Sequence, residues 1–263
     1  MHGAGNSFVI AENLHGEFER TDFSRLARDL CRSGEDIKTD GLMVLTSADG
    51  EADFRMLFYN ADGSVGEMCG NGARCLARYG VDHGLVEDAE HIRILTTAGM
   101  VFGRRIDEEL YEIQLNDPSV IDLNRMADNT ACAYVELGSP GIPHAVVCVE
   151  EKELNDLESL REKGRRLRHC TAFPKGANVT FACKTGISSV KAITFERGVE
   201  DFTLACGTGC GATALTLVLK GVLCGEQIDI NMPGGHLSVK LVREESGYHL
   251  YLTGPTAYGN RLQ

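Results

Sequence analysis

A short glycine-rich turn occurs twice in this chain and constrains its fold more than any other feature. The first copy is Cys-Gly-Asn-Gly at residues 69–72, and the second is Cys-Gly-Thr-Gly at residues 206–209. Each copy follows strand-like runs and precedes a run with helical spacing of apolar residues, at 73–79 and at 212–219. The sequence therefore predicts two similar halves, each with strands, a Cys-Gly turn and a helix.

Further runs of regular spacing surround both turns. Helical spacing is present at 23–31, and a charged helix is expected at 154–167. Asp117 and Pro118 form a typical turn dipeptide, which makes them the best candidate for the junction between the halves. The predicted strands are 42–45, 54–58 and 92–95 in the first half, and 134–137, 145–148, 190–195, 228–230, 237–241 and 248–252 in the second.

Composition excludes several classes of protein. The chain has 263 residues, of which 43% are hydrophobic and 24% charged, enough for one large domain or two small ones with real cores. A net charge of -12 argues against a nucleic-acid binder, which would carry a basic face. No apolar run is long enough to span a bilayer, and no basic start leads into a signal core. We therefore expect a cytoplasmic protein with neither a nucleic-acid nor a membrane partner.

Ten cysteines are spread along the chain without the clustering of a disulfide scaffold. Most have apolar neighbours, as Cys148 and Cys183 do, and are expected to be small buried hydrophobes. Zinc binding by the cysteines at 69, 75, 206 and 210 is disfavoured, because the spacings are unusual and no ligand-spaced histidines accompany them. The sequence predicts no metal site.

The two Cys-Gly turns combine an anion site with a reactive thiol. The first backbone N–H groups of a helix have no partner within the helix, and the helix dipole is positive there, so a carboxylate binds well. Glycine lets the backbone approach such a group closely. The same field is expected to lower the pKa of the adjacent cysteine towards neutrality.

A pair of such turns suits the inversion of an amino-acid α-carbon. Removal of the α-proton leaves a carbanion, which two helix N-termini aimed at the carboxylate would stabilise. Inversion also needs a base on one face and an acid on the other, which one thiolate and one thiol provide without pyridoxal phosphate or another cofactor. Buried structural thiols and a non-catalytic anion-binding protein are the alternatives.

Longer motifs around the turns give the sequence a family resemblance. Residues 1–8, 60–64, 67–75, 176–179, 196–199, 205–209 and 254–257 together resemble the diaminopimelate epimerase family over nearly the whole chain. The resemblance implies an α+β fold of two pseudo-symmetric domains, each a rolled antiparallel or mixed β-sheet around a central helix, with the active site between them. The implied domains are 1–116, completed by a C-terminal strand at 253–263, and 117–252.

The resemblance also implies the site residues and the reaction, the interconversion of LL- and meso-diaminopimelate. Cys69 and Cys206 become the acid/base pair, and His144 matches a family histidine near the thiols, although a structural histidine is an equal alternative. The implied substrate-binding residues are Asn6 at the reacting centre, the backbone of Gly70, Asn71, Gly207 and Thr208 at the reacting carboxylate, Asn60, Asn178 and Arg197 at the distal carboxylate, and Glu196 near the distal amine. The analogy also suggests a homodimer.

The sequence departs from the family pattern in a few places. Ile142 replaces the usual asparagine that contacts the distal amine, and Ser7 replaces an aspartate. Because isoleucine cannot accept a hydrogen bond from an ammonium group, a racemase for another amino acid, for example histidine, is an alternative substrate assignment. Arg197 and Glu196 favour a substrate with a second carboxylate. Which cysteine rests as the thiolate stays open.

Overall fold

The structure, a computed structural model, describes residues 1–18, 21–32, 39–66 and 68–259. The chain forms two compact units, one made of Met1–Gln114 with Gly254–Gln263 and the other of Leu115–Thr253. Few helices and many strands in mixed pairing give a mixed α/β fold with a large mixed sheet. Glu67, in the family motif 67–75, lies outside the described residues. So do residues 260–263, at the end of the first predicted domain.

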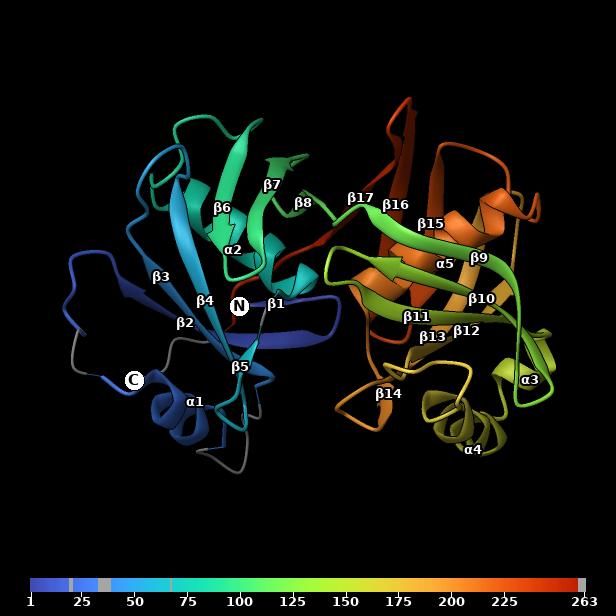
Figure 1. Cartoon of the computed structure of the whole chain (residues 1–263). Coiled ribbons are helices and arrows are strands. Elements are labelled where there is room, and N and C mark those ends of the chain that lie inside the picture. Colours follow the sequence, from blue (N-terminus) through green and yellow to red (C-terminus); the bar gives the residue numbers. More distant parts are fainter. Residues whose placement is uncertain (19–20, 33–38, 67, 260–263) are drawn as a thin grey trace. The chain divides into compact units, whose positions relative to one another are not determined.

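In the first unit, each pair of parallel strands is joined through a helix (Figure 1). Strands β2 and β3 are parallel with α1 between them in sequence, and β4 and β6 are parallel with α2 between them, as parallel crossovers require. The remaining pairs, β1/β2, β3/β4, β4/β5, β6/β7 and β7/β8, are antiparallel. The elements are β1 (His2–Gly3), β2 (Asn6–Asn13), α1 (Phe23–Arg32), β3 (Gly41–Thr46), β4 (Phe54–Asn60), β5 (Val65–Gly66), α2 (Gly70–Asp82), β6 (Ile92–Thr96), β7 (Gly99–Arg105) and β8 (Leu110–Gln114).

The second unit has its own pair of parallel crossovers. Strands β11 and β12 are parallel across α3 and α4, and β13 and β15 are parallel across α5. The pairs β9/β10, β10/β11, β12/β13, β13/β14, β15/β16 and β16/β17 are antiparallel. The elements are β9 (Pro118–Ala127), β10 (Thr130–Leu137), β11 (Ile142–Cys148), α3 (Glu151–Leu154), α4 (Leu157–Arg168), β12 (Asn178–Lys184), β13 (Ser189–Glu196), β14 (Asp201–Thr203), α5 (Gly207–Leu219), β15 (Gln227–Met232), β16 (Gly235–Glu244) and β17 (Gly247–Pro255), whose last residues belong to the first unit.

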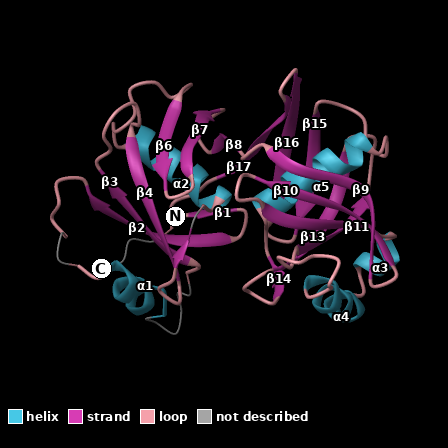
Figure 2. Ribbon diagram, in the orientation of Figure 1, coloured by secondary structure: helices cyan, strands magenta, loops and turns pink. Residues whose placement is uncertain are grey.

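One helix of each unit is packed by strands on several sides. Helix α2 contacts β1, β2, β4, β6, β7 and β8, and α5 contacts β10, β11, β12 and β16. Figure 2 shows α5 among the strands of its unit, with α3 and α4 outside them. Residues Gly209–Leu217 of α5 are all buried, as expected for a helix that is apolar around its whole circumference. The absence of a side chain at Gly72 leaves room for the end of the Met43 side chain, which a Cβ there would overlap.

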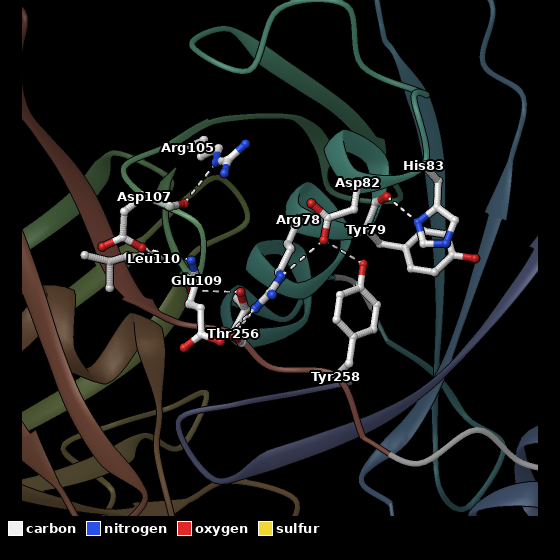
Figure 3. A network of polar contacts seen from close by, with 10 residues as sticks. All are labelled: Arg78, Tyr79, Asp82, His83, Arg105, Asp107, Glu109, Leu110, Thr256 and Tyr258. Carbon is white, nitrogen blue, oxygen red and sulfur yellow. Dashed lines mark hydrogen bonds and ion pairs between the residues drawn. The ribbon is translucent and has the colours of Figure 1, made fainter.

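A polar network holds the C-terminal segment against α2 (Figure 3). Arg78 on α2 donates a 2.6 Å hydrogen bond from Nη1 to the carbonyl oxygen of Thr256, and its guanidinium lies 5.0 Å above the ring of Tyr258. The Tyr258 hydroxyl donates to Asp82 at 2.9 Å. The Thr256 backbone N–H donates to the Glu109 carbonyl at 2.8 Å. The last described residues of the chain therefore fix the helix that follows Cys69.

Most of the predicted elements are present, and three local predictions are wrong. The helix predicted at 154–167 is broken at Asn155 and Asp156, because the Asp156 carboxylate accepts from the Ser159 N–H and starts a new helix, α4. Helices α2 and α5 begin directly after their cysteines rather than at 73 and 212. Cys183 is buried as predicted, but Cys148, the last residue of β11, is exposed. No helix among the described residues is long and apolar enough to cross a membrane.

Candidate active site

The two motif cysteines occupy the same backbone position at the starts of α2 and α5. Cys69 has φ -128° and ψ 112°, and Cys206 has φ -128° and ψ 105°. Each is the last extended residue before its helix, and each carbonyl accepts the first helical hydrogen bond, from Ala73 at 2.8 Å and from Cys210 at 2.9 Å. Both thiols therefore lie beside the N-terminal turn of a helix.

The predicted carboxylate-binding backbone lies in these same first turns. Gly70 and Asn71 open α2, and Gly207 and Thr208 open α5. N–H groups at these positions have no acceptor within their own helix, and the positive end of the helix dipole adds to their attraction for an anion. Each helix start can therefore bind a carboxylate next to a thiol.

The environment of Cys206 contradicts one sequence-based expectation. The helix start was expected to lower the pKa of this cysteine, but burial of the side chain, 7% exposed, raises the pKa of the Cys206 thiol well above its usual value. The negative charge of Glu196 raises this pKa further. The Gly209 N–H and the Thr208 hydroxyl lower it, but by less. Cys206 is therefore a protonated thiol at neutral pH.

Two buried threonines lie beside the first turn of α5. The hydroxyl oxygens of Thr180 and Thr194 are 2.9 Å apart, one donating to the other. A Cβ at Gly209 would lie 3.1 Å from each of these oxygens and 3.2 Å from the Cys206 sulfur. The absence of a side chain at Gly209 thus allows the strands and the thiol to pack closely. Neither threonine was predicted from the sequence, because their place beside Cys206 depends on the pairing of strands β12 and β13.

In the first unit, three polar residues are connected near Cys69. The Asn71 side chain accepts a 2.6 Å hydrogen bond from Nη2 of Arg74 and donates a 2.5 Å hydrogen bond to Oδ1 of Asn6. The predicted site residues Asn6 and Asn71, which are 65 positions apart, are thus brought together. Asn60, at the end of β4, donates instead to the Ser64 hydroxyl at 2.9 Å within its own turn.

In the second unit, the predicted distal-carboxylate residues are adjacent. Oδ1 of Asn178 accepts a 2.8 Å hydrogen bond from the backbone N–H of Arg197, so its amide NH2 group is left to donate elsewhere. The exposed Arg197 guanidinium donates from Nη1 to the Lys175 carbonyl at 3.2 Å. Glu196 accepts a 2.9 Å hydrogen bond from the Thr203 hydroxyl. Lys175 and Thr203 were not singled out from the sequence, since neither lies in the recognised motifs.

His144 lies on β11, with Asn178 as its partner on the parallel strand β12. The ring is fully buried, and neither ring nitrogen has a hydrogen-bond partner among the described residues. Burial, with a smaller effect from the positive charge of Arg197, lowers the pKa of His144 to about 3. His144 is therefore a neutral imidazole at neutral pH. Ile142, at the start of the same strand, is half-buried.

No cluster of three or more histidine, cysteine, aspartate or glutamate side chains able to hold a metal ion is present in residues 1–18, 21–32, 39–66 and 68–259. The described site residues include thiols, amides, hydroxyls, one guanidinium, one carboxylate and one imidazole. These groups can bind carboxylates and transfer protons.

The fold resembles those of solved structures of phenazine biosynthesis proteins and of one predicted epimerase. A Bacillus anthracis phenazine biosynthesis protein of the PhzF family has a TM-score of 0.70 at 13% identity, over 97% of this chain and 92% of that one. A predicted epimerase from Pseudomonas aeruginosa has a TM-score of 0.62 at 14% identity, over 95% and 90% of the two chains. These likenesses define the class of fold.

The sequence comparisons define the family within that class. The family model for diaminopimelate epimerase matches residues 1–114 and 137–258. The diaminopimelate epimerases of Chlorobaculum tepidum and of Hydrogenobaculum sp. are each 34% identical to this chain, over 97% of it and over 96% and 93% of their own lengths. That of Nitratiruptor sp. is 36% identical over 92% of this chain and 89% of its own. The chain belongs to the diaminopimelate epimerase family.

Proposed function

We propose that this chain is an isomerase that interconverts LL- and meso-diaminopimelate by moving the α-proton between Cys69 and Cys206. The epimerase activity follows from the family, whose matched members carry that name over nearly their full lengths. The two-cysteine mechanism is supported by one observation above all. Both cysteines have the same backbone conformation, and each directly precedes a helix that begins with glycine.

The proposed proton transfer needs only the substrate and the two cysteines. A thiolate on one face removes the α-proton, so that the C–H bond breaks and an S–H bond forms. The thiol on the other face then gives its proton to the planar carbanion, and a new C–H bond of opposite configuration results. The raised pKa of Cys206 favours this residue as the first proton donor and Cys69 as the first base. The reverse reaction exchanges these roles.

Stabilisation of the carbanion is assigned to the two helix starts. The N–H groups of Gly70, Asn71, Gly207 and Thr208 would donate to the carboxylate as it gains negative charge. Fixed donors of this kind contribute most where the charge develops, so they lower the barrier more than they strengthen substrate binding. The mechanism requires both sulfur atoms to reach the same α-carbon.

Recognition of the distal end of diaminopimelate is assigned to Arg197, Asn178 and Asn60. A guanidinium matches a carboxylate with two parallel hydrogen bonds, and the Asn178 NH2 group is left to donate because its oxygen is already used. Glu196 carries the negative charge that the distal ammonium group needs. Ile142 cannot accept a hydrogen bond from that group.

The paired strands also support two pseudo-symmetric domains, 1–116 with 253–263 and 117–252. In the first series, β2/β3 and β4/β6 are parallel, and β1/β2, β3/β4, β6/β7 and β7/β8 are antiparallel. The second series repeats this order, with β11/β12 and β13/β15 parallel, and β10/β11, β12/β13, β15/β16 and β16/β17 antiparallel. In each series a helix connects the same two parallel pairs, and a cysteine motif opens the second of these helices. By analogy we also propose a cytoplasmic homodimer.

Hydrogen exchange at the α-carbon tests the proposal directly. The wild-type protein is incubated with LL-diaminopimelate in deuterated water under reducing conditions, and α-deuterium is followed by NMR. We expect incorporation by the wild-type protein, and we expect formation of the meso isomer to fall on the order of 100-fold or more in Cys69→Ala and in Cys206→Ala. Cys148→Ala removes an exposed thiol outside the motifs and should leave the rate unchanged.

Three other results would overturn the substrate assignment, the two-base mechanism or the enzymatic activity. Exchange on histidine but not on diaminopimelate would overturn the substrate assignment while leaving the cysteine chemistry intact. Full activity of either motif variant would overturn the two-base mechanism. Failure of the wild-type protein to exchange any amino acid would support an anion-binding protein instead.

A further inference from the structure

A fully buried arginine lies behind the predicted carboxylate site. Arg74, the fifth residue of α2, has an exposed fraction of 0%. Its Nη2 donates to Oδ1 of Asn71 at 2.6 Å, and Nδ2 of Asn71 donates to Oδ1 of Asn6 at 2.5 Å. Asn71 is 2% exposed, whereas Asn6, on β2, is half-buried. The relay therefore runs from the buried arginine outward to a side chain that a ligand can contact.

The chemistry of the three groups allows only one orientation of the relay. A guanidinium has N–H donors and no acceptor, so Asn71 must direct its amide oxygen at Arg74. The NH2 group of Asn71 then faces Asn6, which can meet it only with an oxygen. Because oxygen and nitrogen lie on opposite sides of a carboxamide, the NH2 group of Asn6 is directed away from Asn71.

We propose that Arg74 is a positioning residue that makes Asn6 a hydrogen-bond donor to the reacting end of the substrate, through the amide of Asn71. The inference rests on the proposed function, which assigns Asn6 to the reacting centre. A donor at this position favours an anionic group, whereas an amide oxygen there would repel one. The arginine thus acts on the ligand through the direction of two amides and without touching it.

The relay explains why an asparagine is suited to position 71. Its backbone N–H is assigned to the substrate, and its side chain both accepts from Arg74 and donates to Asn6. A residue with only acceptors or only donors cannot do both. Position 208, the corresponding position of the second motif, holds a threonine whose hydroxyl lies 3.7 Å from the Cys206 sulfur. The relay is therefore a feature of the first motif.

The substitution Asn71→Asp tests the relay with an isosteric side chain. The new carboxylate would still accept from Arg74, but its second oxygen would force Asn6 to turn its amide and present its own oxygen to the ligand. We expect the fold to be retained and kcat/KM for diaminopimelate to fall roughly 10- to 100-fold, with a marked rise in KM, as for loss of a hydrogen bond to a charged group. Asn124→Asp adds the same charge at an exposed position and serves as the control.

Substitutions of the arginine test its own role. Arg74→Lys keeps a donor, and we expect it to retain most of the activity, whereas Arg74→Met removes the donor and frees both amides to rotate. Side-chain amide signals in ¹⁵N–¹H NMR spectra of the ligand-free protein report this orientation directly. The Asn6 and Asn71 signals should shift in Arg74→Met and return towards their wild-type positions in Arg74→Lys.

The positioning role of Arg74 can be lost while the epimerase activity stands, and different measurements report the two. If the wild-type protein exchanges diaminopimelate but Asn71→Asp has wild-type KM and kcat, or the Asn6 signal in folded Arg74→Met is unchanged, the positioning role is wrong. A purely structural role of Arg74 would lower the melting temperature of Arg74→Met without altering the Asn6 amide. If the wild-type protein is inactive, the NMR comparison still decides whether the relay exists.

Discussion

The phenolic hydroxyl of Tyr258 donates a 2.9 Å hydrogen bond to the carboxylate of Asp82, the last residue of α2. The two residues are 176 positions apart. Asp82 also accepts from Arg78, which in turn donates to the carbonyl of Thr256. The C-terminal segment is therefore tied to the helix whose first turn carries part of the candidate site.

Removal of the hydroxyl in Tyr258→Phe should destabilise the first unit modestly. The ring and its contact with Arg78 are retained, so the expected loss is that of one hydrogen bond to a partly exposed carboxylate, about 0.5–1.5 kcal/mol in the free energy of unfolding. Urea denaturation measures this change. Tyr248→Phe is the control, because its ring also lies under an arginine, Arg243, and its hydroxyl takes part in no hydrogen bond of the described residues. Equal effects of the two substitutions would contradict the assigned role.

A methyl group at Gly209 should impair catalysis as well as stability. The added Cβ would press on the Cys206 sulfur and on the hydroxyls of Thr180 and Thr194, all between 3.1 and 3.2 Å away. We expect Gly209→Ala to lower the free energy of unfolding by about 1–3 kcal/mol and to lower kcat more than it raises KM. Gly211→Ala, in the same helix, meets the Leu115 side chain at 2.7 Å and should destabilise without changing the kinetics of the folded protein.

The stability of the protein should fall in mild acid because of His144. Its pKa is about 3 in the folded state and 6.5 unperturbed, so between these values the unfolded chain binds a proton that the folded chain does not. Stability therefore rises with pH through this window, by about 1.4 kcal/mol per pH unit, and the contribution of this residue is constant above it. As the pH falls from 7 to 5, His144→Gln should lose less stability than the wild-type protein. His15→Gln, at an exposed histidine, is the control.

Loss of the Arg197 guanidinium should affect recognition more than proton transfer. We expect Arg197→Ala to raise KM for diaminopimelate roughly 10- to 100-fold, as for loss of a charge-assisted hydrogen bond, with a smaller change in kcat. Arg197→Lys keeps the charge but loses the planar guanidinium, so its KM should lie between those of the wild-type protein and Arg197→Ala. Arg165→Ala removes an exposed arginine of the same unit and is the control. An unchanged KM in Arg197→Ala would show that the distal carboxylate binds elsewhere.

Much of the fold was predictable because its signals are local. Helices α1, α2 and α5 and strands such as β3, β4 and β16 follow from apolar periodicity within a few residues. Strand β9 was not predicted, since most of its residues are exposed or half-buried and alternate poorly. The break before α4 depended on the side chain of Asp156 capping the new helix, which competes with a continuous helical pattern.

Some features of the candidate site were likewise predictable from local sequence, and others were not. Cys69 and Cys206, with the glycines after them, were found from the sequence because a helix start is defined by adjacent residues. The relay from Arg74 to Asn6 joins a strand to a helix far along the chain, and no spacing rule reaches that distance. The sequence predicted a lowered pKa for Cys206, whereas the pKa is raised, since the sequence indicates the helix start but not the depth of burial.

By itself, the sequence determined two cysteines at two helix starts and membership of an epimerase family, because these depend on short motifs and on interactions within one turn. Only the tertiary structure decided which groups surround those thiols, how deeply they are buried and which way the amides of Asn6 and Asn71 point. The physical reason is that desolvation and hydrogen bonding between distant segments depend on the packing of strands and helices, which neighbouring residues do not encode.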